Sequence, residues 1–351
     1  MCQQKRLSIC YLNNEWVGYV LKLRRRGVIT SQMGFGIVEL MARRARIVWR
    51  LPKKQRDLAS RWYSPRFGNW FQQWKAVSLL GRYDAIYSAN TDTMGMLAIL
   101  RSVGLFSKPI VALLHTPFVT NTFRGRLRAK LVLGGLDRVL CYTPSLLKHT
   151  QEKFPEYASK MLDSGIGPDL PMYPKWQSEG KFFVASGITG RDYALLARAF
   201  QDLPYRCRVH PGRPNLGEKF PSNVELSLGD GQCEKLLDDL SRAMALIVPI
   251  RKDCCTASTH GVSSFFDALG IGIPCIVARS PWLIDVEKEG IGLWYEPGDE
   301  RSLRDAITRL ASDEGLRTAM SERARNLAMT RNMDALGESI FQSLRDVTGY
   351  R

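Results

Sequence analysis

Short apolar runs alternate with longer helical patterns along the whole chain. In the first half the runs cover 6–12, 84–90, 109–115 and 137–143. In the second half they cover 181–187, 205–211, 223–228, 245–250 and 274–278. Runs of this length that are bounded by turn residues and separated by helices are typical of parallel β/α units. The pattern predicts an α/β protein with two doubly wound parallel sheets, one in each half.

Two sheets imply two domains, and 351 residues are enough for two hydrophobic cores. We place the first domain at 1–175 and the second at 176–333, joined near 172–181. We expect a C-terminal helix, about 334–351, to pack back on the first domain. Ligands of doubly wound sheets bind at the carboxyl ends of the strands, so the loops directly after the strands are candidates for the site.

Charge separates the two halves further. The chain has 50 Lys and Arg against 34 Asp and Glu, a net charge of +16. Residues 1–175 hold 28 of these cations and 10 of these acids, which is +18, so the remainder is −2. The first half is therefore expected to meet an anionic partner.

Cysteine and histidine usage argues against metal and disulfide sites. The eight Cys contain no C-x-x-C pair and the four His are not clustered, which predicts neither a zinc site nor a disulfide framework. The N-terminal segment is too polar for a signal peptide, and no stretch approaches the roughly 20 apolar residues of a spanning helix. We expect a cytoplasmic protein.

The segment 43–76 interleaves cations with aromatic residues. The aromatics are Trp49, Trp62, Tyr63, Phe67, Trp70, Phe71 and Trp74. One interpretation is a helical insertion whose aromatic side chains pack on the domain and whose cations are solvated. The other is an interfacial surface, since Trp combined with Arg and Lys suits a place among anionic headgroups. The sequence leaves both open.

The stretch 250–278 holds the richest candidate chemistry. Gly261 and the pair Ser263 and Ser264 open a predicted helix that carries Asp267. Backbone N–H groups, the helix dipole and a Ser hydroxyl at such a start suit a phosphate group. Asp267, one turn further on, suits the hydroxyls of a ribose. Ordinary helix capping by Ser is the competing interpretation.

Several collinear stretches carry a family resemblance. They are 136–170, 185–200, 245–250, 261–263, 267–269, 272–276 and 290–326. Together they resemble GT-B glycosyltransferases, in particular the GT4-like family (glycosyl transferases group 1). The resemblance implies two Rossmann-like domains facing a central cleft. It also implies transfer of a sugar from a UDP- or GDP-linked donor, with retention of configuration and with no metal or other cofactor.

The resemblance assigns donor-site roles to matching residues. Arg191 would neutralise the donor diphosphate, although an Arg after a turn can equally be a surface residue. Gly261, Val262, Ser263 and Ser264 would grip the same diphosphate at the helix start. Asp267 would hold the ribose in place of the usual Glu.

A second group of roles concerns the reacting sugar. His115 would lie beside it as the catalytic candidate, although a His at a strand end is often structural. Thr259 stands where the family has an acidic residue, so Thr259 and His260 become candidates for the donor sugar. Ile188 replaces a usual Arg. Arg251 and Lys252 are possible further phosphate contacts.

The loop after the first predicted strand is the candidate for the acceptor side. Asn13, Asn14 and Gly18 follow the first strand, where many family members have two Gly for acceptor approach. Gly18 is equally well explained as a helix Gly. With the basic first domain, we expect a lipid-linked or polysaccharide acceptor in surface polysaccharide or lipopolysaccharide biosynthesis. The protein would then attach peripherally to the anionic inner face of the cell membrane.

Other functions compete with sugar transfer. A catalytically silent GT-B scaffold is favoured by Thr259 and Ile188, which replace the usual charged residues. A nucleic-acid partner is not expected, because no recognition-helix, RNP or KH signature accompanies the basic charge. A nicotinamide-dependent enzyme lacks the G-x-G-x-x-G after the first strand.

Overall fold

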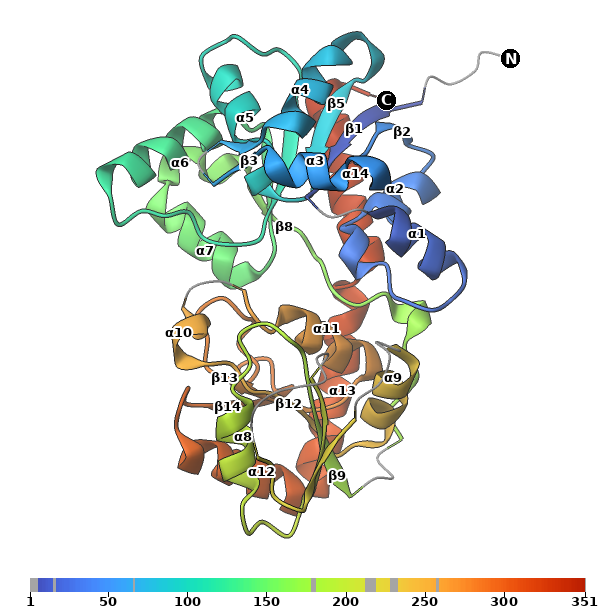
Figure 1. The fold of residues 1–351 in the computed structure, drawn as a ribbon, viewed down its shortest axis with the longest axis vertical. Helices are drawn as coiled ribbons and strands as arrows, with labels where there is room; N and C mark the ends of the chain where they lie inside the picture. Colours follow the sequence, from blue (N-terminus) through green and yellow to red (C-terminus); the bar gives the residue numbers. More distant parts are fainter. Residues whose placement is uncertain are drawn as a thin grey trace. The chain divides into compact units, whose positions relative to one another are not determined.

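The structure, a computed structural model, describes residues 6–14, 17–65, 67–177, 181–211, 219–227, 233–256 and 259–350, apart from the side chains of Leu58 and Cys233. The chain forms two compact units. Unit 1 comprises Met1–Ile166 and Met333–Arg351, and unit 2 comprises Gly167–Asn332 (Figure 1). The division falls after Ile166, earlier than the expected boundary at 175.

Unit 1 is built on a six-stranded sheet in which every neighbouring pair is parallel. The strand order is β2-β1-β5-β6-β7-β8. The strands are β1 (Ser8–Leu12), β2 (Arg46–Trp49), β5 (Ala85–Ser88), β6 (Ile110–Leu114), β7 (Arg138–Cys141) and β8 (Met161–Asp163). The residues of β5 and β6 are all buried, because helices cover both faces of a parallel sheet.

The helices of unit 1 connect these strands, and one comes from the end of the chain. They are α1 (Val17–Arg25), α2 (Ile37–Ala42), α5 (Gly95–Ser102), α6 (Phe123–Gly135), α7 (Pro144–Lys153) and α14 (Met333–Thr348), with 3-10 turns at Gln32–Gly34, Leu80–Arg82, Thr91–Thr93 and Pro155–Lys160. Helix α14 lies against α2, where Arg43 pairs with Asp334 at 2.7 Å and Glu338 at 3.0 Å. The C-terminal helix therefore belongs to unit 1.

The segment 43–76 contributes to the sheet as well as to its cover. It begins with the edge strand β2, continues through a 3-10 turn (Lys53–Gln55) and α3 (Arg56–Arg61), and ends in a short hairpin, β3 (Tyr63–Ser64) and β4 (Gly68–Asn69), followed by α4 (Trp70–Ser78). The sequence pattern did not predict β2, because its residues are only partly buried and its apolar run is short. Trp49 packs against a small core of Leu51, Ala59 and Phe71.

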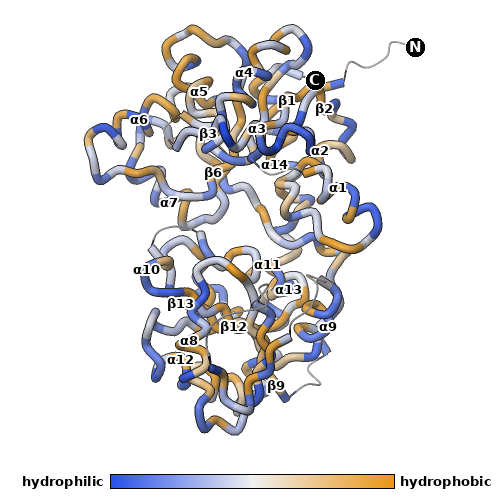
Figure 2. Tube along the Cα trace, in the orientation of Figure 1, coloured by the Kyte–Doolittle hydropathy of each residue, from blue (hydrophilic) through white to orange (hydrophobic). Residues whose placement is uncertain are grey.

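Unit 2 repeats the architecture with the strand order β11-β10-β9-β12-β13-β14, again all parallel. The strands are β9 (Phe182–Ser186), β10 (Arg206–His210), β11 (Val224–Leu226), β12 (Leu246–Val248), β13 (Cys275–Ala278) and β14 (Gly292–Tyr295). The helices are α8 (Tyr193–Phe200), α9 (Cys233–Arg242), α10 (Lys252–Cys255), α11 (Val262–Ile271), α12 (Glu300–Ser312) and α13 (Glu314–Thr330), with a 3-10 turn at Leu170–Met172. Hydrophobic and hydrophilic stretches alternate along both units (Figure 2).

Candidate donor site in unit 2

The order of strands in unit 2 places at the carboxyl end of β9 the switch point at which α/β proteins form a ligand-binding crevice. From β9 the chain continues to β10 on one side, whereas β12 lies on the other side. Loops that leave neighbouring strands in opposite directions open the space in which α/β proteins bind ligands. Here the two loops are joined by a bridge between Arg191 and Ile250 and by a hydrogen bond of 2.8 Å from the Arg251 N–H to the Gly190 carbonyl.

Arg191 lies largely buried in this crevice, and three hydrogen bonds fix its guanidinium. Nε donates to the Ser186 carbonyl at 2.8 Å and Nη1 to the Thr189 carbonyl at 2.9 Å. Nη2 donates to Ser264 Oγ at 2.9 Å. A guanidinium has five N–H donors, so two remain for an anion. Burial lowers the pKa of Arg191, but a guanidinium stays charged at neutral pH.

Gly187 makes this position of Arg191 possible. It has a φ of +111°, and a Cβ there would collide with the Arg191 guanidinium. Only glycine combines this backbone conformation with the space that the guanidinium takes. Gly187 was not among the residues predicted from the sequence. A Gly directly after a strand and four residues before the candidate Arg is the signal that points to it.

The start of α11 lies beside Arg191 through Ser264. Gly261 caps the helix with a φ of +89°, and a Cβ there would lie 2.7 Å from Ile250. No side chain caps the helix, and its Val262 N–H bonds to the Thr259 carbonyl, so the N–H groups of Ser263 and Ser264 are the ones that a ligand would meet. Ser264 is 5% exposed and contacts Arg191, whereas the Ser263 side chain is exposed to solvent. The structure thus brings Arg191, Ser264 and the start of α11 together, whereas the Ser263 side chain does not join them.

Asp267 follows one turn further along α11. Its Oδ1 accepts a hydrogen bond of 2.7 Å from the Tyr173 hydroxyl. Burial raises the pKa of Asp267 to about 7, against the opposing effects of that hydrogen bond and of the Arg191 charge. Tyr173 comes from the segment after the 3-10 turn at Leu170–Met172, and its ring covers Gly270, where a Cβ would lie 2.6 Å from it. No pattern in the sequence connects Tyr173 with Asp267.

Four further candidates surround the cluster. His260 lies beside Gly190, and its Nδ1 is 3.3 Å from the Cys254 carbonyl. The Thr259 carbonyl accepts a bond from the Val262 N–H at the start of α11. The structure turns Arg251 towards Asp253, at 3.2 Å, and Cys254. Lys252 lines a separate cavity of about 680 Å³ with residues of the turn at 296–301.

His115 closes β6 in unit 1. Its Nε2 lies 2.7 Å from the Ala89 carbonyl, so this nitrogen carries the proton of the neutral ring. The ring stacks on Tyr142, with centroids 4.6 Å apart, and meets the edge of Phe35 at 4.8 Å. Burial lowers the pKa of His115 to about 4. His115 is therefore a neutral hydrogen-bonding group at pH 7 and not a cation.

The loop after β1 is held by α4. Asn13 is buried, its N–H donates to Gln72 Oε1 at 3.0 Å, and its side-chain amide donates to the Tyr11 hydroxyl at 3.2 Å. Asn14 accepts a bond of 3.3 Å from Gln72 Nε2. Gly18 lies in α1 and lines a cavity of about 560 Å³ together with β2. The structure thus gives Asn13 a clear structural role.

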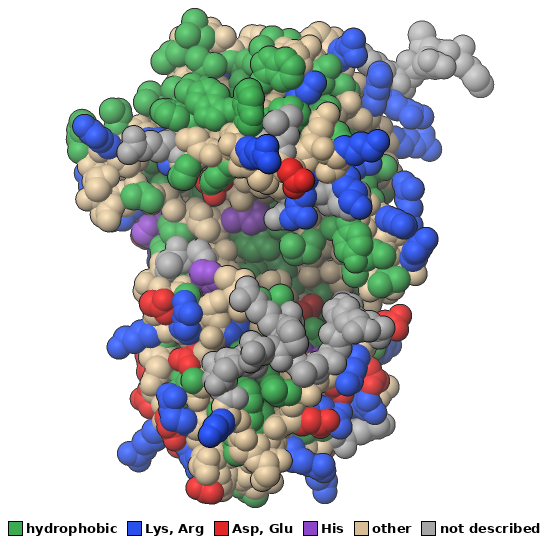
Figure 3. All heavy atoms as spheres, viewed as in Figure 1, with side chains coloured by type: hydrophobic (Ala, Val, Ile, Leu, Met, Phe, Trp, Pro, Cys, Tyr) green, Lys and Arg blue, Asp and Glu red, His purple; other side chains and the backbone are tan. Residues whose placement is uncertain are grey.

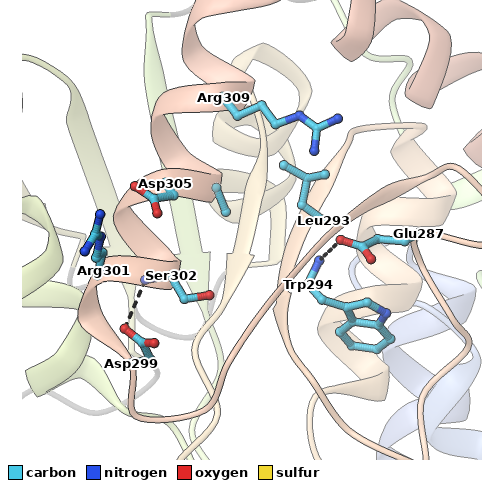
Figure 4. A pocket seen from close by; sticks show the side chains of 9 residues that line it. Glu287, Leu293, Trp294, Asp299, Arg301, Ser302, Asp305 and Arg309 are labelled. Carbon is cyan, nitrogen blue, oxygen red and sulfur yellow. Dashed lines mark hydrogen bonds between the residues drawn. The ribbon is translucent and has the colours of Figure 1, made fainter.

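Another cavity of unit 2 lies outside the donor cluster. It has a volume of about 330 Å³ between β14 and α12 (Figure 4). Its lining is Glu287, Leu293, Trp294, Asp299, Arg301, Ser302, Asp305, Ala306 and Arg309. Asp299 and Glu287 already accept backbone N–H groups, from Ser302 at 3.0 Å and Trp294 at 3.3 Å. The cavity shares no lining residue with the Arg191 cluster.

Metal ligands and membrane spans are the remaining features that bear on function. In the part of the chain that the structure describes, no group of three or more His, Cys, Asp and Glu is placed to hold a metal ion. Among the described helices, none has the length and apolar character needed to cross a membrane.

Comparison with known proteins gives matches among solved structures. No protein-family model matches the chain, and no curated protein matches it either. A sucrose-phosphate synthase from Thermosynechococcus elongatus matches with a TM-score of 0.66 at 14% identity, over 99% of this chain and 100% of that chain. A glycosyltransferase from Rickettsia africae gives 0.64 at 10%, over 98% and 99%. Anabaena HepE, in complex with UDP-glucose, gives 0.63 at 14%, over 97% and 100%.

These similarities cover both units at low sequence identity. They show that the chain has the two-domain α/β fold of GT-B glycosyltransferases, which confirms the fold class predicted from the sequence. The GT4-like subgroup stays a prediction.

Proposed function

We propose that the protein is a glycosyltransferase that binds a nucleotide diphosphate sugar in the crevice of unit 2. The observation that supports this most directly is the Arg191 guanidinium beside Ser264 and the uncapped start of α11. A fixed cation and the N–H groups of a helix start together suit a diphosphate. The fold, which is shared with glycosyltransferases, supports the same conclusion.

The proposed chemistry rests on stabilising the leaving group. As the bond between the sugar and the diphosphate breaks, negative charge grows on the phosphate oxygens. Arg191 and the first N–H groups of α11 are already oriented, so they stabilise this charge without reorganisation. In this proposal the enzyme needs no metal and retains the configuration of the sugar. His115, neutral at pH 7 with its proton on Nε2, would accept a hydrogen bond at Nδ1 beside the reacting sugar.

The remaining roles follow from position. Asp267 would accept a ribose hydroxyl, and Thr259 and His260 would contact the donor sugar. Unit 1 carries 29 Lys and Arg against 12 Asp and Glu, which supports an anionic acceptor there. We propose a lipid-linked or polysaccharide acceptor of surface polysaccharide synthesis, reached at the inner face of the cell membrane. Asn13, Asn14 and Gly18 remain the acceptor-side candidates.

The donor proposal is tested by nucleotide binding. We expect UDP or GDP, but not CMP, to raise the thermal midpoint of the protein, since the expected donor is UDP- or GDP-linked. Arg191→Ala and Ser264→Ala should remove this rise. Arg198→Ala is the matched control, because Arg198 is an exposed arginine of unit 2 that pairs with Glu300, and it should keep the rise. If neither UDP nor GDP raises the midpoint of the unmodified protein, the proposal is wrong.

A second candidate is a catalytically silent GT-B protein. Tyr173 already occupies one oxygen of Asp267, and no acid stands at Thr259. A protein of this kind would bind a nucleotide but would not cleave the bond between the sugar and the diphosphate of a nucleotide sugar. Measuring UDP release from UDP-sugars, with and without candidate acceptors, separates it from the enzyme.

A further inference from the structure

Helix α4 buries two glutamines and exposes two tryptophans and a valine. Phe71, Gln72, Gln73 and Ala76 are buried, whereas Trp70, Trp74 and Val77 are exposed at the spacing of one helical face. Trp74 is 57% exposed. A surface helix of a globular protein normally buries its large apolar side chains and exposes its glutamines. The outward face of α4 therefore presents apolar area that the chain itself does not cover.

The buried glutamines explain why the helix holds this orientation. Gln72 Oε1 accepts the Asn13 N–H at 3.0 Å, and Asn69 caps the helix by accepting the Gln72 N–H at 3.1 Å. Gln73 Oε1 accepts the Leu97 N–H at 2.9 Å, and its Nε2 donates to the Phe67 carbonyl at 2.9 Å. Rotating α4 to bury its tryptophans would break these bonds in the interior. Each unsatisfied buried group would cost about 1–3 kcal/mol.

The exposed face of α4 continues into its neighbours. We use the term aromatic surface for the exposed Trp62, Tyr63, Phe67, Trp70 and Trp74. The Trp70 N–H bonds to the Trp62 carbonyl at 2.9 Å, and the Phe67 and Trp70 rings are 5.8 Å apart. Hydrophobic side chains gather over α4 and α5 on the face shown in Figure 3.

Cations border the aromatic surface. Lys75 Nζ lies 4.7 Å from the centre of the Trp74 ring. Tyr63 is within electrostatic reach of Asp92 and of Arg128 of α6, and these two charges also act on each other. Helix α6 also carries Arg124 and Arg126, and it exposes Phe123, which is 81% accessible. Helix α6 contains no acidic residue. The aromatic surface thus lies beside the cations of α4 and α6, with Asp92 as an acid near Tyr63.

We propose that the aromatic surface docks on an anionic lipid bilayer, with Trp70 and Trp74 among the headgroups. Tryptophan favours the bilayer interface, and each cation near an anionic membrane adds about 1 kcal/mol of attraction. Charge argues against a second copy of this chain, because two units of +17 would repel each other. The inference rests on the proposed function only in placing the acceptor at the membrane.

The test is sedimentation of the full chain with vesicles. We expect the protein to sediment at low salt with phosphatidylcholine vesicles that contain phosphatidylglycerol, and not with phosphatidylcholine alone. Trp70→Ala with Trp74→Ala should weaken this binding at least tenfold. The matched control is Leu226→Ala with Met329→Ala, two exposed apolar residues of unit 2, which should bind as the unmodified protein does.

Two double variants that reverse charge test the contribution of the cations. Arg124→Glu with Arg126→Glu should weaken binding, whereas Arg301→Glu with Arg309→Glu in unit 2 should not. Unchanged circular dichroism and thermal midpoint of each variant establish that it is folded. The proposal is overturned if the unmodified protein stays in the supernatant at low salt, or if the tryptophan variant binds normally. It is also overturned if a DNA duplex binds more tightly than the vesicles and the tryptophan variant loses that binding.

The vesicle result and the donor proposal are judged separately. UDP binding is measured on the same preparations by thermal shift. Vesicle binding without any nucleotide binding would support the docking surface and refute the donor site. Nucleotide binding without vesicle binding would support the donor site and refute the docking surface.

Discussion

Replacing Asp267 by Asn should change how the stability of the protein depends on pH. The pKa of Asp267 is raised from 3.8 to about 7 by burial. The folded state therefore holds this proton more tightly than the unfolded state does. The resulting stabilisation is complete below about pH 4 and is lost as the pH rises through 7. A rise of about three in pKa corresponds to about 4 kcal/mol, which is an upper value because the buried carboxylate can relax.

The amide of the Asp267→Asn variant cannot titrate, so the variant should lose this dependence. We expect the fall in unfolding free energy between pH 4 and pH 8 to be smaller by up to about 4 kcal/mol in Asp267→Asn. For a unit of this size, each 1 kcal/mol moves the thermal midpoint by roughly 2–4 °C, so calorimetry at several pH values resolves the effect. Equal pH dependence in both proteins would refute the reasoning.

Tyr173→Phe examines the same carboxylate from its partner. The Tyr173 hydroxyl stabilises the charged form of Asp267, so its removal raises the pKa of Asp267 further. Tyr173→Phe should lower the unfolding free energy by about 1.5–3 kcal/mol at pH 8, where the carboxylate is charged, and by less at pH 5. If Asp267 accepts a ribose hydroxyl, UDP should also bind more tightly as the pH rises through 7. An effect of Tyr173→Phe that is the same at both pH values would contradict this account.

Three further predictions have defined outcomes. Gly187→Ala should displace the Arg191 guanidinium and remove the thermal shift with nucleotide, whereas Gly315→Ala, which meets only an ordinary contact, should not. The imidazole of His115 should stay neutral in NMR titrations down to about pH 5, and the stability that it contributes above pH 6.5 should disappear as the pH falls to about 4. Trp176→Phe removes the bond of 2.7 Å from Nε1 to the Ala243 carbonyl and should lower the unfolding free energy by about 1–3 kcal/mol, which denaturant unfolding would measure.

The strands were largely predictable because most of them are buried on both faces. All nine predicted apolar runs contain a strand, and the two sheets follow from them. In the two six-stranded sheets, β2, β8 and β14 were not predicted, and neither was the short hairpin of β3 and β4. β2 and β8 are short and partly exposed at sheet edges, so their apolar runs are weak. β14 is fully buried, and the same rule applied to 292–295 would have found it.

The donor cluster was predictable in its parts but not in its contacts. The start of α11 follows from Gly261 and the two serines, and the structure places Arg191 beside it. Ser263 and Ser264 point to different sides of α11, so the exact start of the helix decides which of them contacts Arg191. In the structure it is Ser264. Tyr173 is far from Asp267 in the sequence and reaches it only through the path of the connecting segment. A contact of this kind leaves no local pattern.

The two interpretations of the segment 43–76 prove to be compatible in its structure. Trp49 and Phe71 pack on unit 1, as an insertion requires, while the aromatic surface stays exposed. Hydrophobicity alone does not separate these groups, because the residues alternate within a few positions. The buried bonds of Gln72 decide the orientation, and Gln72 also holds the loop that carries Asn13 and Asn14. A membrane-bound α4 would therefore fix the acceptor-side loop of unit 1 directly, without any intervening element.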